Sequence, residues 1–296
     1  MEQCWQRRKG MNRARIFAVM VLYKRLLEES ETFSTLRSIL QKRTDLAGAI
    51  SLLIYDNSPV AQEVQALPIP TQYISNPANP GLAAAYSAGL QLAGQETADW
   101  LLLLDQDTTL TEEYLEEISS GAVHLLSDRK IVGIVPKLSN KGVLCSPLYP
   151  PTYGPARMID RTTAGDSSQR LHVFNSGAVL RVSSLKTIGG FPEDFPLDYL
   201  DHATFAALQD RGGQLHILNA ILEHELSSNV EGNRDPDFVQ RQTSILDAEY
   251  RFYKQYGSAG DRTRRRLRLI RASLGRVLRR KDKSQTWRML KSAFRP

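Results

Sequence analysis

The sequence predicts an α/β fold, in which a mostly parallel central sheet is covered by helices on both faces. Continuous apolar runs of strand length occur at residues 15–23, 49–58, 99–107 and 130–138. Segments with helical spacing lie between these runs, at residues 26–41, 82–93 and 112–126. Strands that are apolar throughout are typical of parallel sheets buried on both faces, and their alternation with helices favours the same arrangement.

The later part of the chain is less regular. Residues 139–170 are rich in Pro, Gly and Ser, which predicts a long loop or a flexible lid. A strand, a short capped helix and a loop-to-helix segment then follow. We expect residues 11–258 to form one domain with two halves, 11–138 and 139–258. A flexible extension (1–10) would precede it and a basic helical tail (259–296) would follow it.

Composition excludes several classes of protein. Of the 296 residues, 42% are hydrophobic, which favours a packed core over disorder. The two cysteines, Cys4 and Cys145, cannot form a disulfide framework, so a reducing compartment is expected. The apolar run near the N-terminus is too short for a membrane span and lacks the cleavage site of a signal peptide. We therefore expect a cytoplasmic protein.

The basic residues are concentrated at the C-terminus. Residues 261–296 contain 14 Lys and Arg against two Asp, a local charge of +12, whereas the other 260 residues sum to −6. Apolar residues recur in this tail at helical spacing, among them Leu267, Leu274 and Val277. A basic amphipathic helix predicts peripheral attachment to an anionic membrane. Nucleic-acid binding, which we do not expect, an oligomer contact and a solvated tail are the alternatives.

Polar residues follow three of the predicted strands, at Tyr23-Lys24, at Asp56–Ser58 and at Asp105–Asp107. The carboxyl ends of parallel strands meet at one edge of a sheet, where ligands bind. Asp105 and Asp107 are two residues apart in extended chain, so their carboxylates point the same way and repel unless a cation lies between them. Mg²⁺ or Mn²⁺ is the expected occupant. The alternative is a polar turn in which Thr108 or Thr109 caps the next helix.

Several segments, in order, resemble motifs of family 2 glycosyltransferases, which have the GT-A fold. The stretch "LLLLDQDT" is similar to the Asp-Gln-Asp motif of the rhamnosyltransferase-like branch, and "VMVLYK" and "LIYDNSP" resemble the motifs of the first two strands. "NPANPGLAAAYSAGL", "FNSGAVL", "IGGFPEDFPLDYLDHATF" and "LEHEL" resemble later elements of the family. The resemblance extends from Arg15 to about Ser228.

The resemblance implies a nucleotide-binding half at residues 11–138. Tyr23 would stack on or border the base, and Asp56 would bind the base or the ribose. The nucleotide pocket would be lined by Asn79 and Gly81, with glycine allowing close backbone approach. Two residues would act at the ribose or diphosphate: Asp105 would face the ribose or the metal, and Asp107 would be the main metal ligand.

The resemblance also implies an acceptor-side half at residues 139–258, to which His224 would add a further metal or diphosphate contact. Inverting transfer needs a general base beside the acceptor hydroxyl, and the family draws it from the segment that contains Asp198 and Asp201. Asp201 is preferred slightly over Asp198 as the base, and one of the two is expected to cap the helix instead. The acceptor side would be lined by Asn175, Ser176 and Gly177.

Together these features predict an inverting, metal-dependent glycosyltransferase. The donor would be a nucleotide-diphosphate sugar carrying dTDP, UDP or GDP, with rhamnose as the leading sugar. The acceptor would be a bacterial polysaccharide or lipopolysaccharide precursor, or another lipid-linked glycan, at the inner face of the cell membrane. The same fold with another hexose donor is one alternative, and a catalytically inactive membrane-binding or nucleic-acid-binding module is the other.

Overall fold

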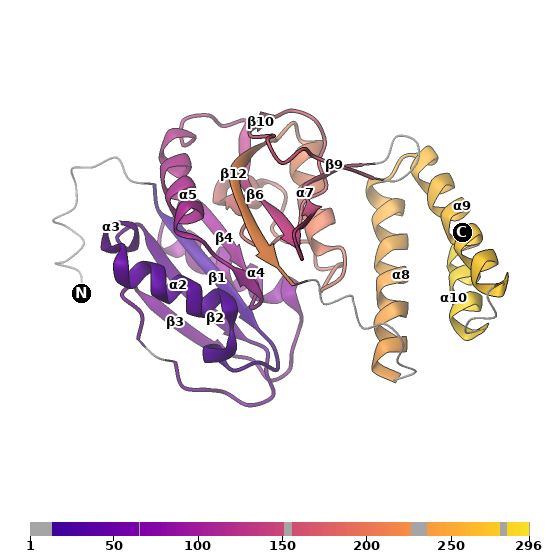
Figure 1. Cartoon of the computed structure of the whole chain (residues 1–296), viewed down its shortest axis with the longest axis horizontal. Coiled ribbons are helices and arrows are strands. Elements are labelled where there is room, and N and C mark those ends of the chain that lie inside the picture. Colours follow the sequence, from indigo (N-terminus) through magenta and orange to yellow (C-terminus); the bar gives the residue numbers. More distant parts are fainter. Residues whose placement is uncertain (1–13, 65, 151–155, 226–235, 279–282, 296) are drawn as a thin grey trace.

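The computed structural model describes residues 14–64, 66–150, 156–225, 236–278 and 283–295. Its central sheet has the order β10-β12-β6-β11-β4-β1-β2-β3, with β5 added beside β12 and β7 beside β6 (Figure 1). The six longest strands all point the same way: β1 (Ile16–Leu22), β2 (Ile50–Asp56), β3 (Thr71–Ser75), β4 (Trp100–Leu104), β6 (Ile131–Asn140) and β12 (Gln214–His224). The short β11 (Val179–Arg181) runs in the opposite direction between β4 and β6. The predicted mostly parallel sheet is therefore confirmed.

The sheet separates two hydrophobic cores, because successive strand side chains point to opposite faces. Phe17 and Val19 of β1 enter one core, and Ala18 and Met20 enter the other. The first core is covered by α4 (Leu82–Gln95), α6 (Val182–Thr187) and α7 (Leu200–Asp210). The second is covered by α2 (Glu31–Lys42), α3 (Thr44–Ala47) and α5 (Glu112–His124), with the short 3₁₀ helix η1 (Leu27–Glu29) leading into α2. Helices on both faces confirm the predicted fold class.

Two helices on the second face begin at side-chain caps. The side chain of Ser30 accepts a hydrogen bond from the Phe33 amide at the start of α2. The side chain of Thr111 does the same for the Tyr114 amide at the start of α5. Thr108 and Thr109, which the alternative interpretation took as the cap of α5, instead form β5 (Thr108–Thr109) and pair with the end of β12. Capping α5 therefore does not explain the Asp-Gln-Asp motif.

The segment expected to be a long loop contains several short strands. They are β7 (Val143–Ser146), β8 (Leu148–Tyr149), β9 (Arg157–Met158) and β10 (Gly165–Ser167). The prediction of a continuous loop is wrong for the described part of residues 139–170. Strands of two to four residues are too short to show the period-two alternation by which a strand is recognised in sequence.

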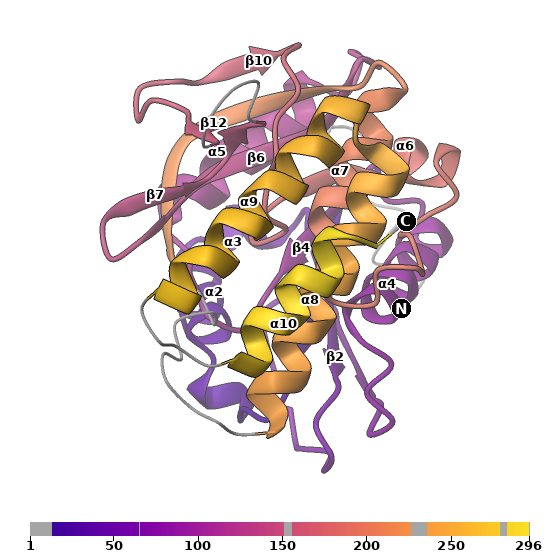
Figure 2. The ribbon, with the colours of Figure 1, turned by 90° about the vertical axis from the view of Figure 1, so that its right-hand side faces the viewer.

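Three helices complete the chain beyond the sheet: α8 (Pro236–Tyr256), α9 (Ala259–Leu278) and α10 (Lys283–Ala293). They stand together at one side of the domain (Figures 1 and 2). The predicted C-terminal helical extension is therefore present, and among the helices of the described part of the chain none could cross a membrane. The extension expected at residues 1–10 lies outside the described residues.

A buried ionic network fastens these three helices to one another. Arg265 of α9 contacts Glu249 of α8 at 3.2 Å, and both side chains are buried. Arg265 also donates to the Ser292 hydroxyl of α10 at 2.6 Å and to the Ser292 carbonyl at 3.0 Å. Glu249 receives a second cation, Arg268, and the hydroxyl of Tyr199 at 3.2 Å. The tail is thus packed through polar contacts onto α8 and, through Tyr199, onto the start of α7.

Replacing Glu249 with Gln should lower the free energy of unfolding by about 3 kcal/mol, because Arg265 would keep its burial and lose its counter-ion. Asp247 of the same helix provides the matched control, since its ion pair with Arg295 is exposed. The Asp247→Asn change should alter stability by less than about 1 kcal/mol. Urea unfolding followed by circular dichroism measures both, and equal stabilities of the two variants would contradict the role given to Glu249.

Candidate active site

The polar ends of β1, β2 and β4 meet at one edge of the sheet. Leu22, the last residue of β1, is in register with Asp56, the last residue of β2. The amide of Tyr23 donates to the Gln106 side chain at 2.9 Å, which joins the loops that follow β1 and β4. The amide of Lys24 donates to Ser58 at 2.9 Å. The convergence predicted from the strand ends is therefore confirmed.

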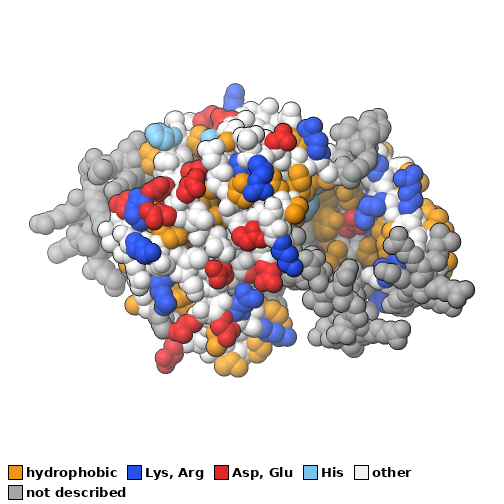
Figure 3. Space-filling view, viewed as in Figure 1, with side chains coloured by type: hydrophobic (Ala, Val, Ile, Leu, Met, Phe, Trp, Pro, Cys, Tyr) orange, Lys and Arg blue, Asp and Glu red, His pale blue; other side chains and the backbone are white. Residues whose placement is uncertain are grey.

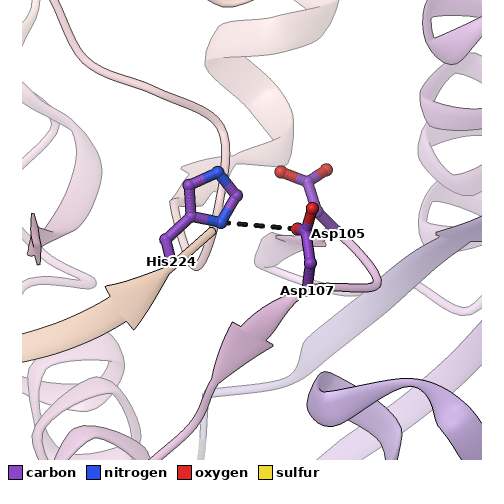
Figure 4. A group of neighbouring side chains, drawn as sticks. All are labelled: Asp105, Asp107 and His224. Atoms are coloured by element: carbon purple, nitrogen blue, oxygen red, sulfur yellow. Dashed lines mark ion pairs between the residues drawn. The ribbon is translucent and has the colours of Figure 1, made fainter. Parts of the chain in front are cut away.

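Asp105, Asp107 and His224 form a compact group at this edge (Figure 4). Each residue offers one ligand atom, and these atoms lie within 4.8 Å of one another. The pairing of β5 with β12 places His224 opposite Thr108, next to the two carboxylates. Nδ1 of His224 lies 3.4 Å from Oδ1 of Asp107. The two-residue strand β5 thus places His224 next to residues that lie more than 110 positions earlier in the chain.

Neighbouring hydroxyl groups orient this cluster. The Tyr86 hydroxyl donates to Oδ1 of Asp105 at 3.0 Å, and the Ser176 hydroxyl donates to Oδ2. Thr108 Oγ1 lies 2.9 Å from Nδ1 of His224. The sequence prediction missed Tyr86 and Thr108, because Tyr86 looks like an ordinary core residue of α4 and Thr108 acts only through strand pairing. Asp105 is therefore held on both oxygens, whereas Asp107 is not.

The surroundings of Asp107 fit a divalent cation. Its Oδ1 is buried and receives no hydrogen bond from the described part of the chain. Burial and the adjacent carboxylate of Asp105 raise the pKa of Asp107 to about 6, although His224 and Arg25 act in the opposite direction. Ligands at about 2.1 Å from Mg²⁺ are at most about 4.2 Å apart, so small side-chain shifts would close the group around one ion. Two carboxylates and an imidazole are ligands that Mg²⁺ and Mn²⁺ accept.

A cleft of about 190 Å³ opens beside this cluster. Asp105 and His224 line one part of it, and Asp201 lines another. Asn175 and Ser176, both expected on the acceptor side, also line the cleft. The buried Oδ1 of Asn175 has no hydrogen-bond partner among the described residues. The cleft is thus bounded by three carboxylate or imidazole groups and by two polar side chains, as a site for a polar ligand requires.

Gly177 follows the two cleft-lining residues Asn175 and Ser176 and makes a tight turn there. Its backbone has φ +72°, and a Cβ there would lie 3.0 Å from Leu222 and 3.2 Å from the Tyr114 hydroxyl. The Tyr114 hydroxyl donates to the Gly177 carbonyl at 2.5 Å. Glycine is needed here because its backbone is left-handed and its surroundings are crowded. Gly177 therefore fixes the course of the Asn175–Ser176 segment.

The structure separates the two candidate bases. The carboxylate of Asp198 is buried and bound by Arg241 at 3.0 Å and by the Ser244 hydroxyl at 2.9 Å, both on α8. Asp201 lies in the first turn of α7 and faces the cleft. Its Oδ1 lies 2.7 Å from Nδ1 of His202. The geometry thus favours Asp201 as the residue that meets an acceptor and Asp198 as an anchor of the loop.

His202 holds one oxygen of Asp201 in a fixed position. Burial alone would lower the pKa of His202, but the facing carboxylate of Asp201 outweighs it and raises the pKa of His202 above its ordinary value. The ring of His202 lies among those of Tyr199, His172 and Phe252, with centroids 4.9 to 5.8 Å away. This packing fixes the imidazole, which in turn fixes one oxygen of Asp201 and leaves the other for a ligand.

Asp56 is more enclosed than the resemblance suggested. Its side chain is fully buried, and its oxygens accept hydrogen bonds from the Ser58 amide at 2.9 Å, Gln62 at 2.8 Å and the Tyr73 hydroxyl at 2.9 Å. A direct contact with a base or ribose would have to replace one of these bonds. The neighbouring Asn57 has a buried Oδ1 without a hydrogen-bond partner among the residues that the structure describes. It is an additional candidate, placed from sequence in the polar strand end but given no role of its own there.

Gly81 brings the start of α4 against the loop that precedes α7. Its φ is +98°, and a Cβ there would lie 2.5 Å from the carbonyl oxygen of Pro196. The same oxygen accepts hydrogen bonds from the Leu82 and Ala83 amides, at 2.7 and 3.0 Å, at the start of α4. The close backbone approach that glycine allows is therefore made to the loop that contains Pro196. Asn79 and Tyr23 are both exposed beside this region, Asn79 with a φ of +47°.

Comparison with known proteins agrees with this architecture. Among solved structures, the crystal structure of S. aureus TarS has a TM-score of 0.52 at 14% identity, over 81% of this chain and 43% of that chain. The crystal structure of S. aureus TarS 1–349 has a TM-score of 0.49 at 13% identity, over 81% of this chain and 72% of that chain. At such identities a likeness concerns the fold alone, and this chain spans less than half the length of the first of them. No curated protein matches the chain.

The family model described as glycosyl transferase family 2 matches residues 18–187. These residues are more than half of the chain, and they include most of β1, all of β2 and β4, and the Asp-Gln-Asp motif. The predicted family is thus confirmed. The chain belongs to glycosyl transferase family 2.

Proposed function

We propose that this enzyme transfers a sugar, with inversion, from a nucleotide-diphosphate donor to a hydroxyl group of a glycan or lipid-linked acceptor. A deoxyhexose such as rhamnose is the leading donor, and a bacterial polysaccharide or lipopolysaccharide precursor is the leading acceptor. The observation that carries the proposal is the shared cleft. It joins Asp105 and His224, which fit a diphosphate-bound cation, to Asp201, a carboxylate oriented to accept a proton.

The donor would lie across the ends of β1, β2 and β4. Tyr23 is exposed and would border the base, while Asn57 and Asn79 would offer polar contacts to the nucleoside. Asp56 would shape this pocket through its bonds to Gln62 and Tyr73. Asp107, with Asp105 and His224, would hold Mg²⁺ or Mn²⁺. A bound divalent cation would neutralise the charge that grows on the leaving diphosphate.

Asp201 would act as the general base. The acceptor oxygen attacks the anomeric carbon while the bond from that carbon to the diphosphate oxygen breaks, and the hydroxyl proton passes to Asp201. Asn175 and Ser176 line the cleft beside Asp201 and would orient the acceptor. His202 holds Asp201 in one rotamer, which is the positioning that a base in hydrogen-bond reach requires.

The basic C-terminal helices are the part of the chain that would bind the membrane. An acceptor carried by a lipid is presented at the bilayer surface, so a cytoplasmic enzyme that uses it benefits from attachment to the inner face of the membrane. The charge of +12 over residues 261–296 is suited to an anionic leaflet. We therefore propose peripheral attachment through these helices, and we expect no role in nucleic-acid binding.

Thermal denaturation with a panel of nucleotides tests the proposal. UDP, dTDP and GDP are each added at 1 mM, a concentration of about 100 Kd for a 10 μM ligand, which stabilises a protein by about 2.7 kcal/mol. We expect one base to raise the midpoint by several degrees with Mn²⁺, and much less with EDTA. The nucleotide base that binds limits which sugars the donor can carry. No shift with any of the three would contradict the proposal and favour an inactive binding module.

A further inference from the structure

The C-terminal helices bury several polar side chains and expose several large apolar ones. Side chains buried between α8, α9 and α10 include Arg265, Ser273, Thr286 and Ser292. Side chains on the outside include five large apolar residues that are between 50% and 71% exposed: Leu267, Leu274, Val277, Trp287 and Phe294. A water-soluble bundle places its apolar stripe inside. Here the buried ion pair of Arg265 and Glu249 lies between α9 and α8.

The exposed apolar residues share a face on each helix. On α9, Leu267 and Leu274 are seven residues apart, and Val277 follows three residues later, so all three lie on one side of the helix, away from the buried Arg265. Trp287 and Phe294 are also seven residues apart and share a face of α10, opposite the buried Ser292. Figure 2 shows α9 and α10 together on the side of the molecule that faces the viewer.

Cationic side chains surround these apolar residues. Arg266 and Arg271 of α9 and Lys291 of α10 are exposed, and the side chains of Arg268 and Arg295 are about half exposed. Figure 3 shows hydrophobic and basic side chains next to one another on the helices at its right-hand side. An apolar face with basic residues at its margins fits a bilayer surface, where the apolar groups enter the acyl boundary and the cations meet anionic headgroups.

We propose that this outer face, formed by Leu267, Leu274, Val277, Trp287 and Phe294 with their neighbouring Arg and Lys residues, lies on an anionic lipid bilayer. The inference deepens the proposed function, since it names the surface through which the enzyme would reach a lipid-linked acceptor. A second copy of the chain is a poorer occupant, because a twofold contact would bring two cationic faces together. Nucleic acid is a poorer one too, because Leu267, Leu274 and Val277 are aliphatic and offer nothing to phosphates.

Attachment at this face would fix the orientation of the cleft relative to the bilayer. The buried network that joins α9 and α10 to Glu249 of α8 also receives the Tyr199 hydroxyl, which lies two residues before Asp201. Arg241 and Ser244 of α8 bind Asp198 in the same loop. The lipid-facing helices and the loop that carries Asp201 are therefore fastened to one helix, so the bilayer would have a fixed orientation relative to the cleft.

Vesicle flotation tests the inference. The full chain is mixed with vesicles of phosphatidylglycerol and phosphatidylcholine in equal amounts, or of phosphatidylcholine alone. We expect flotation with the anionic vesicles only. The double variant Trp287→Ser/Phe294→Ser should float at least about tenfold less, because both side chains are exposed and contribute to the apolar contact. The matched control is Val60→Ser/Val143→Ser, which removes two exposed apolar residues elsewhere and should float like the wild type.

Fluorescence gives a second readout, which reports the surroundings of Trp287 in the vesicle-bound protein. In a Trp5→Phe background the remaining tryptophans are Trp100, which is fully buried, and Trp287, which is exposed. Anionic vesicles should shift the emission to shorter wavelength, and Trp287→Phe should abolish the shift. An unchanged spectrum, or flotation of the double variant equal to that of the wild type, would overturn the inference.

Further outcomes distinguish the lipid-facing surface from a dimer contact and from the proposed transfer reaction. A wild-type dimer that the double variant dissociates, without flotation, would assign the face to a second copy and overturn the inference. The double variant should keep the nucleotide-dependent thermal shift, since its changes lie away from the cleft. Flotation without any nucleotide shift would therefore contradict the proposed transfer reaction alone, and a nucleotide shift without flotation would contradict the lipid-facing surface alone.

Discussion

Replacing Asp107 with Asn should weaken Mn²⁺-dependent nucleotide binding by at least about 100-fold. Loss of an outer partner of a metal ligand already costs 10- to 100-fold, and Asp107 would be a ligand itself. Its Oδ1 receives no hydrogen bond in the structure, so the side chain is available for a cation in a way that Asp105 is not. Isothermal titration with the nucleotide selected by thermal denaturation, in the presence and absence of Mn²⁺, measures the effect.

The variant should remain folded and become more stable without metal. Burial and repulsion by Asp105 raise the pKa of Asp107 to about 6, so the ionised carboxylate destabilises the metal-free protein above that pH. An uncharged amide of the same shape relieves this repulsion. Asp210→Asn, which removes an exposed carboxylate paired with Arg170, is the matched control and should change neither property. Undiminished metal-dependent binding by Asp107→Asn would exclude Asp107 from the metal site.

The proton also competes with the metal at Asp107. Because its pKa in the metal-free protein is about 6, Mn²⁺ affinity should be nearly constant above pH 7 and should fall as the pH drops below 6. The Asp107→Asn variant should lose this part of the pH dependence. Titrations of Mn²⁺ at pH 5, 6 and 7.5 separate the two proteins.

The general architecture was predictable from sequence because its signals are local. The continuous apolar runs at β1, β2 and β4 indicate strands buried on both sides, and the polar residues that follow them indicate the edge where a ligand binds. The Asp-Gln-Asp motif follows one of these runs directly. Each of these inferences depends on residues close together in the chain, and parallel pairing then determines where the strand ends meet.

The details of the site depend on contacts between distant residues, which no local pattern reveals. Tyr86 orients Asp105 from a helix whose small residues indicated only close packing. His224 reaches the carboxylates because β5, two residues long, pairs with the end of β12. Asp198 and Asp201 have the same local signals, and only Arg241 and Ser244, more than 40 residues later, distinguish them. The exposed apolar face of α9 and α10 was likewise undetermined, since a helical period does not say which side faces the protein.

Replacing Asp201 with Asn should lower kcat by about 10²- to 10⁴-fold, the range that a positioned general base contributes. The amide keeps the shape of the carboxylate but cannot take the acceptor proton. Asp201 lines the cleft without belonging to the Asp105–Asp107–His224 group, so nucleotide affinity and its Mn²⁺ dependence should stay within about twofold of wild type. An effect on kcat without one on donor binding distinguishes a base from a residue that binds the donor.

The assay follows release of nucleoside diphosphate from the sugar nucleotide that carries the selected base, with a bacterial membrane lipid extract as acceptor. Asp198→Asn is the matched control, three residues earlier in the same loop. Its carboxylate is already engaged by Arg241 and Ser244, so its loss should loosen the loop and lower kcat by less than about tenfold. Full activity of Asp201→Asn together with a severe loss in Asp198→Asn would transfer the role of base to Asp198. Equal, severe losses in both, with donor binding intact, would show that the chemistry depends on the loop as a unit.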